Sequence, residues 1–208
     1  YEPVNILYED AFLIAAFKPP FLLVHDDGNS QDTLQARING YLQLNGNKYP
    51  AQAIHRIDYE TSGLVLFCKH PFFQAYCDKN MEEHHIKKDY IALVQGHTNY
   101  KNKKIVSNIA RDRHNAKKMI IHPNGKESIS IFNTLKNYKD YSLIQVTILT
   151  GRKHQIRVQC ASLKHPILND SLYGGKRIDN TGLLLQSHHI QFNDIDIICP
   201  QEKRFIRK

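Results

Sequence analysis

The segment from His55 to Gly63 holds residues that could do chemistry, directly before an apolar run. Asp58 is a carboxylate flanked by His55 and Arg56, and Thr61-Ser62-Gly63 follows it. An ionised carboxylate at the edge of a core can act as a nucleophile. An aspartate on such a turn can equally be a turn or capping residue without a chemical role. The segment by itself leaves both interpretations open.

Two further segments place polar side chains beside apolar runs. Lys88-Asp89-Tyr90 puts an aromatic ring at the start of a short apolar run, which packing alone can explain. The segment Thr150–Arg157 (TGRKHQIR) collects cations where a helix is expected to begin. The positive end of a helix macrodipole disfavours cations. This segment therefore needs an anion nearby, either a phosphate or a carboxylate.

The charge of the chain is unevenly distributed. Lys and Arg number 28 against 20 Asp and Glu, which gives +8 at pH 7. Residues 1–50 carry a net charge of −3, whereas residues 101–126 carry a net charge of +7. Clustered cations of this kind indicate a polyanionic partner, and a solvated loop with a basic bias is the alternative. The basic residues of this segment are Lys101, Lys103, Lys104, Arg111, Arg113, Lys117, Lys118 and Lys126.

Several classes of protein find no support in the sequence. No apolar run approaches the length of a membrane span, and Tyr1-Glu2-Pro3 does not open a secretory signal. The 12 histidines include the pairs His84-His85 and His188-His189 but no metal-ligand spacing, so we expect no metal. Neither GxGxxG nor GxxxxGK[ST] occurs, so no nucleotide cofactor is expected. The four cysteines lack CxxC spacing and indicate buried thiols in a reducing compartment.

Apolar spacing predicts many strands and few helices. Strands are expected over 10–17, 63–67, 90–94, 144–148, 183–185 and 195–198. Helices are expected from Leu34, from Pro71 to about Glu83, and around Ile156 and Cys160. Strands and helices do not alternate regularly, and no repeat or linker divides the 208 residues. We therefore predict a single domain, residues 1–208, of the α+β class.

Taken together, these segments resemble the RluA-type family of pseudouridine synthases. The order and spacing agree from about residue 6 to residue 192. The resemblance implies a mixed, mainly antiparallel central sheet with peripheral helices and a catalytic cleft. His55–Gly63 is similar to the signature HRLDxxTSG, residues 88–96 to KxYxAxVxG, Gly151–Val158 to GRTHQIRV, and His165–Gly174 to HPILGDPLYG.

The chain departs from the family pattern at several positions, none of which is the Asp, Tyr or Arg of the expected centre. These departures bear on the substrate and not on the reaction. Lys153 replaces Thr, Gln159 replaces His, Asn169 replaces Gly, Ser171 replaces Pro, Gln186 replaces His, and Phe17 and Phe21 stand where NKPxG has Asn and Gly.

The resemblance implies isomerisation of uridine in RNA, in which the base is detached, rotated and rejoined through carbon without a cofactor. The target base must first leave its stack. Asp58 would attack the anomeric carbon or the pyrimidine ring, or assist loss of the base, and these routes stay open. Arg157 would pair with the ionised Asp58, and Tyr90 would stack on the uracil. Leu185 would line the pocket with apolar surface.

The same resemblance implies how the RNA is held. Arg56 would fill the space that the base vacates, or else contact a phosphate. Many relatives carry a small RNA-binding domain before the catalytic one, and we expect that domain to be missing here. The expected partner is a stem-loop of tRNA or large-subunit rRNA, bound by a cytoplasmic monomer with no membrane involved. Further RNA-facing side chains would be His55, Arg152, Lys153, His154, Lys117 and Lys118.

Two other classes of function fit part of the pattern. A catalytically inactive RNA-binding module would share the basic surface but would have no reason to retain Asp58, Tyr90 and Arg157 together. A histidine-based RNA hydrolase would use paired histidines as acid and base. The product separates them, because isomerisation leaves the RNA length unchanged and hydrolysis shortens it.

Overall fold

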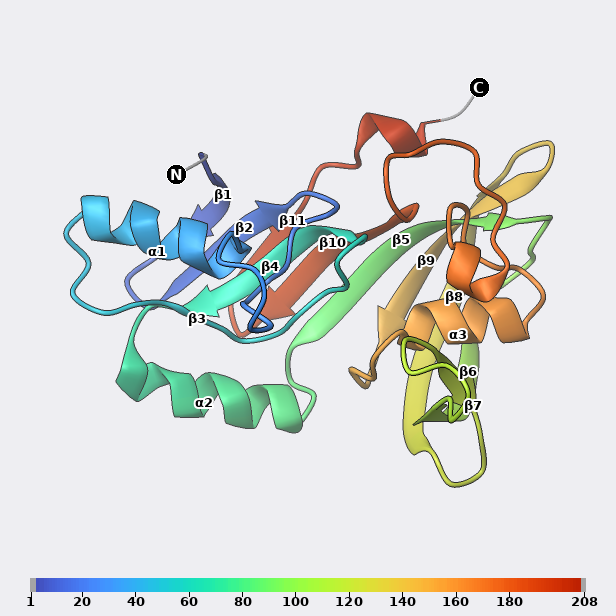
Figure 1. The fold of residues 1–208 in the computed structure, drawn as a ribbon, viewed down its shortest axis with the longest axis horizontal. Coiled ribbons are helices and arrows are strands. Elements are labelled where there is room, and N and C mark those ends of the chain that lie inside the picture. The colour runs from blue at the N-terminus through green and yellow to red at the C-terminus, as the bar shows by residue number, and fades with distance from the viewer. Residues whose placement is uncertain (1–2, 207–208) are drawn as a thin grey trace. The chain divides into compact units, whose positions relative to one another are not determined.

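A computed structural model describes residues 3–206, which form two compact units (Figure 1). The first unit comprises residues 3–86 and Ser187–Cys199. The second comprises Lys87–Gln186 and residues 200–206. That residues 1–208 form a single domain stays a prediction.

The first unit contains a sheet with the strand order β1–β2–β4–β10. The short β3 pairs with β4, and β11 pairs with β10. The pairs β1–β2, β2–β4, β3–β4 and β10–β11 are antiparallel. The bounds are β1 (Asn5–Glu9), β2 (Leu13–Lys18), β3 (Gln52–Ala53), β4 (Ser62–Cys68), β10 (Leu185–Phe192, in this unit from Ser187) and β11 (Ile195–Ile198).

Two helices accompany these strands, and both begin where the sequence predicted. Helix α1 (Leu34–Leu44) starts after Thr33, whose Oγ1 accepts a hydrogen bond from the backbone N–H of Ala36 at 3.1 Å. Helix α2 (Pro71–Glu82) has Pro71 in its first turn, where a missing N–H costs nothing. Cys77 of α2 packs into a core with alternate residues of β2 and β4. That core fixes the position of β4, which follows the Asp58 segment.

The second unit is an antiparallel sheet in the order β5–β9–β8–β6–β7. Helix α3 contacts β6 and β7. A small core of Ile91, Leu93, Leu143, Leu168, Leu184 and Phe205 holds the unit together. The bounds are β5 (Lys87–Gln95), β6 (Lys103–Arg111), β7 (Met119–Ile121), β8 (Lys126–Asn137), β9 (Tyr141–Ile148), α3 (Gln155–Ser162) and the 3-10 turns η1 (Ser171–Tyr173) and η2 (Lys203–Phe205).

The predicted α+β class, with many strands and few helices, is confirmed. The strand expected over 183–185 begins instead at Leu185 and continues to Phe192. The cationic segment 101–126, for which the sequence predicted no strand or helix, holds β6, β7 and the start of β8. Within residues 3–206, no helix is long and apolar enough to cross a membrane.

Candidate active site

Asp58 of the first unit lies on a tight turn that leads into β4. The backbone N–H of Thr61 donates to the carbonyl of Asp58 at 3.1 Å and closes the turn. Thr61 is buried, the side chain of Asp58 is half-buried and Arg56 is exposed. The turn therefore fixes the backbone of Asp58 and leaves the residue only half-buried.

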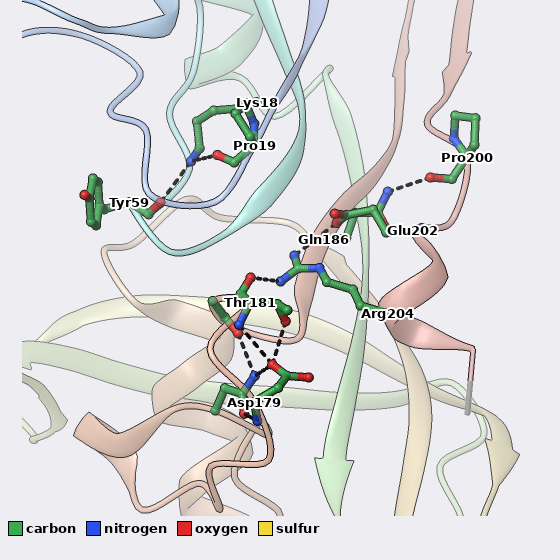
Figure 2. A network of polar contacts seen from close by, with 11 residues as sticks. Lys18, Pro19, Tyr59, Asp179, Thr181, Gln186, Pro200, Glu202 and Arg204 are labelled. Atoms are coloured by element: carbon green, nitrogen blue, oxygen red, sulfur yellow. Dashed lines mark hydrogen bonds and ion pairs between the residues drawn. The ribbon is translucent and has the colours of Figure 1, made fainter. Parts of the chain in front are cut away.

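Lys18, at the end of β2, anchors this turn. Its side chain is fully buried, and Nζ donates to the carbonyl oxygen of Leu22 at 2.7 Å. Nζ also donates to the carbonyl oxygens of Pro19 and Tyr59 at 2.9 and 3.0 Å (Figure 2). A buried ammonium group is tolerated only when its donors are satisfied in this way. Because Tyr59 follows Asp58 directly, Lys18 limits how far the turn can move.

Two close contacts inside the first unit fix the chain on either side of the turn. Gly63 has φ = 111°, and a Cβ there would lie 2.1 Å from the carbonyl oxygen of Ser187 in β10. Only glycine permits that approach of two backbones. His55 accepts a hydrogen bond at Nε2 from the backbone N–H of Leu66 at 3.1 Å. This bond gives His55 a structural role, and its predicted RNA contact stays a prediction.

In the second unit, Tyr90 and Lys88 lie on one face of β5, because side chains two residues apart in a strand share a face. Both are buried. Burial lowers the pKa of Lys88 to about 8. Its Nζ lies 3.9 Å from the place that a Cβ on Gly151 would occupy. Lys88 therefore lies beside Gly151, at the start of the segment that carries Arg152. The sequence did not predict this contact.

Arg157 is held by Asp170 in a bidentate ion pair. Nε donates to Oδ2 and Nη2 donates to Oδ1, both at 2.8 Å. The two residues are 4% and 0% exposed. The resemblance implied Asp58 as the partner of Arg157. Asp58 and Arg157 belong to different units, and their pairing stays a prediction.

Tyr173 contacts Arg157 and two of the predicted RNA-facing residues of the second unit, Lys118 and His154. The Arg157 guanidinium lies 5.1 Å and the Lys118 ammonium 5.6 Å from the ring centre. The Tyr173 hydroxyl lies 2.9 Å from Nδ1 of His154 and accepts from the backbone N–H of Met119 at 2.8 Å. Tyr173 therefore ties the start of β7 to the helix that carries Arg157.

The other predicted site residues of the second unit lie before α3, on the turn between β6 and β7, and at the start of β10. Arg152 and Lys153 are exposed before α3, and Nε of Arg152 donates to the carbonyl of Glu127 at 2.9 Å. His154 has φ = 55° and directly precedes the helix. Lys117 is exposed on the turn between β6 and β7, and Leu185 is buried at the start of β10.

The structure accounts for three departures from the family pattern. Asn169 has φ = 68°, a region that asparagine tolerates better than most residues. Its Nδ2 donates to Asp179 at 2.7 Å and to the carbonyl of Gly182 at 2.9 Å. Gln186 donates to the carbonyl of Pro200 and accepts from the N–H of Glu202 (Figure 2). Gln159 is fully buried and donates to the hydroxyls of Ser107 and Ser128.

Sequence reasoning missed three residues that position the site: Lys18, Asp170 and Tyr173. Asp170 and Tyr173 lie within the HPILGDPLYG-like segment, so the motif itself was the available signal. Lys18 stood beside Pro19 at the end of a predicted strand, where a lysine ordinarily faces water. Among residues 3–206, no group of three or more His, Cys, Asp and Glu side chains could hold a metal ion.

Known proteins are similar to this chain in sequence and in fold. A sequence model of the family described as RNA pseudouridylate synthase matches residues 13–162. An uncharacterized RNA pseudouridine synthase of Bacillus subtilis, YhcT, is 35% identical over 178 residues, covering 84% of this chain and 59% of that protein. Ribosomal large subunit pseudouridine synthase D of Borreliella burgdorferi is 32% identical, covering 98% of this chain and 64% of that protein. This chain thus spans less than two thirds of the length of either relative.

The fold has solved counterparts as well. The structure of human RNA pseudouridylate synthase domain containing 1 superimposes with a TM-score of 0.79 at 22% identity, covering 97% of this chain and 84% of that one. The family match, the motifs from His55 to Gly174 and the fold agree. The chain belongs to the RNA pseudouridylate synthase family, as its RluA-type motifs indicated.

Proposed function

We propose that this chain isomerises uridine to pseudouridine in RNA. The observation that carries the proposal is Asp58, a half-buried carboxylate on a turn anchored by Lys18, inside the region that the family model matches. A half-buried carboxylate on a fixed backbone suits attack on a nucleoside.

Each catalytic residue has a distinct task in this proposal. Asp58 is the nucleophile, acting on a uridine that has left its stack. Tyr90 stacks on the uracil ring, and Leu185 contributes apolar surface against it. Arg157 provides the positive charge that stabilises the ionised Asp58. The chemistry breaks and remakes a glycosidic bond, and it needs no redox or phosphoryl cofactor.

The RNA is recognised through cations of the second unit. Lys117, Arg152 and Lys153 are exposed, and Lys118 lies against Tyr173 on the same unit. Such groups neutralise phosphates and release counterions, which favours binding of any RNA strand. We propose a stem-loop of tRNA or large-subunit rRNA as the substrate, because unpaired bases in loops leave their stack most easily. The name of the Borreliella relative supports the ribosomal choice. We propose that the enzyme acts as a monomer in the cytoplasm.

Tritium release tests this proposal. Hairpins transcribed with 5-tritiated uridine, taken from tRNA and from large-subunit rRNA, are incubated with the protein. Isomerisation releases tritium and leaves the RNA at full length, and carbodiimide mapping then places the product. Shortened RNA would identify a hydrolase, and RNA that binds but never releases tritium would identify an inactive binding module.

A further inference from the structure

Phe21 and Tyr59 form an exposed aromatic pair next to Asp58, within the first unit. Their side chains are 47% and 50% exposed, and their ring centres lie 5.8 Å apart with the planes inclined by 67°. The backbone N–H of Phe21 donates to the carbonyl of Tyr59 at 2.8 Å, and Nζ of Lys18 donates to the same oxygen. The two rings are therefore held on one anchored piece of backbone.

The backbone at Phe21 is strained. Its φ is 63°, in the left-handed region that residues with a Cβ avoid and that glycine adopts readily. The motif that this segment resembles, NKPxG, has glycine at this position. A strained residue persists where the surrounding structure holds it and where the strain serves a function. With nearly half of the ring in water, burial alone does not explain why phenylalanine stands here.

We propose that Phe21 and Tyr59 hold an unpaired RNA base that neighbours the uridine at Asp58. Because the ring planes are inclined by 67°, the base stacks on one ring and packs against the other at an angle. The inference rests on the proposed function, because it places this pair beside the reacting nucleotide. Every base has a π-face, so aromatic stacking holds unpaired nucleotides with little sequence preference. The exposed Arg56, on the same turn, can meet a phosphate of that strand. Two half-exposed rings, with an exposed arginine on the Asp58 segment, suit a base better than an apolar protein surface, which needs a far larger area.

Phe21→Gly tests the proposal, because stability and binding should change in opposite senses. Removing the Cβ relieves the strain, so the melting temperature should rise. Removing the ring should weaken binding of a short fluorescein-labelled oligouridylate about tenfold, as measured by anisotropy. The KM for a reactive hairpin should rise in parallel, while kcat stays close to that of the wild type. Phe21→Leu keeps the strained backbone and should weaken binding without the gain in melting temperature.

Tyr59 and Phe72 provide the matched comparisons. Tyr59→Phe should bind like the wild type, and Tyr59→Leu should bind more weakly. Phe72, 87% exposed on α2 of the same unit, is the control, and Phe72→Leu should bind like the wild type.

These measurements distinguish a failure of the base-stacking inference from a failure of the proposed isomerisation. If Phe21→Gly becomes more stable yet binds oligouridylate as tightly as the wild type, the pair is only packing and the inference is wrong. Equal weakening by Phe72→Leu would likewise overturn it, because the effect would then be general to exposed aromatics. If the wild type releases no tritium from any hairpin, the proposed function fails. The binding series, which needs no turnover, still decides whether the pair stacks bases.

Discussion

Arg157 and Asp170 are each buried, and each depends on the other. Removing one partner leaves an ion out of water without its counter-charge, which costs roughly 3–5 kcal/mol. Arg157→Ala and Asp170→Ala should each lower the free energy of unfolding by about that amount. The double variant should recover a large part of it. Urea denaturation of the four proteins gives the coupling energy, and a value near zero would show that the pair does not act as a unit.

Lys88 should make stability depend on pH. Burial lowers its pKa from 10.5 to about 8 in the folded protein, whereas the unfolded chain keeps the ordinary value. Between these values the unfolded Lys88 binds more protons than the folded one, so its contribution to stability should increase as pH rises, by up to about 3 kcal/mol. Burial raises the pKa of the Cys77 and Cys160 thiols, which oppose this trend, so the effect of Lys88 is the difference between variants. Across this range, the free energy of unfolding measured in urea should rise more, or fall less, in the wild type and in Lys104→Met, an exposed control on β6, than in Lys88→Met. The same pH dependence in Lys88→Met would assign the effect to another group.

Two substitutions of Tyr90 should separate its effect on RNA binding from its effect on turnover. Tyr90→Phe keeps the ring, so it should bind RNA almost normally and turn over slowly. Tyr90→Leu should in addition lose base–aromatic stacking, about 1–3 kcal/mol of binding free energy. Anisotropy with labelled RNA and tritium release measure the two effects. Equal binding by both variants would show that Tyr90 does not stack on the base.

At the scale of elements, the cationic strands β6–β8 are the main candidate surface for RNA. Tyr173 fastens the start of β7 by accepting the Met119 N–H, so the cations have a defined position. Lys117→Gln combined with Lys118→Gln should reduce the salt dependence of RNA binding by about one counterion per lysine and leave kcat nearly intact.

The control for this prediction removes the same charge elsewhere. Lys48 and Lys139 are exposed and lie outside the cationic segment. Lys48→Gln combined with Lys139→Gln should leave the salt dependence of binding as in the wild type. An unchanged salt dependence in the Lys117/Lys118 variant would show that these lysines are solvated residues of a surface turn and do not contact the RNA.

Elements with local signals could be predicted from the sequence, and those formed by long-range pairing could not. Thr33 and Pro71 mark helix starts through contacts within a few residues, and α1 and α2 begin as expected. Strand β6 mixes lysine, serine and isoleucine without strict alternation, so only its pairing with β8 and β7 defines it. Asp170 lies 13 residues from Arg157, a separation that no local pattern connects. The motifs thus indicated the candidate reactive residues, and the fold showed which side chains hold them in place.

At the scale of the whole molecule, the proposed reaction draws on both compact units. Asp58 belongs to the first unit, and Tyr90 and Arg157 belong to the second. Neither unit alone carries the full set of proposed catalytic groups. Activity should therefore require the entire chain.

Asp58→Asn tests the central claim most directly, with tritium release from a labelled hairpin as the measurement. The amide keeps the shape of the side chain and removes the nucleophile, so the variant should bind RNA and show no turnover. Glu60→Gln, a half-buried carboxylate on the same turn, is the matched control and should stay active. Turnover by Asp58→Asn above about a thousandth of the wild-type rate would contradict the account, because losing a covalent nucleophile normally costs more than that.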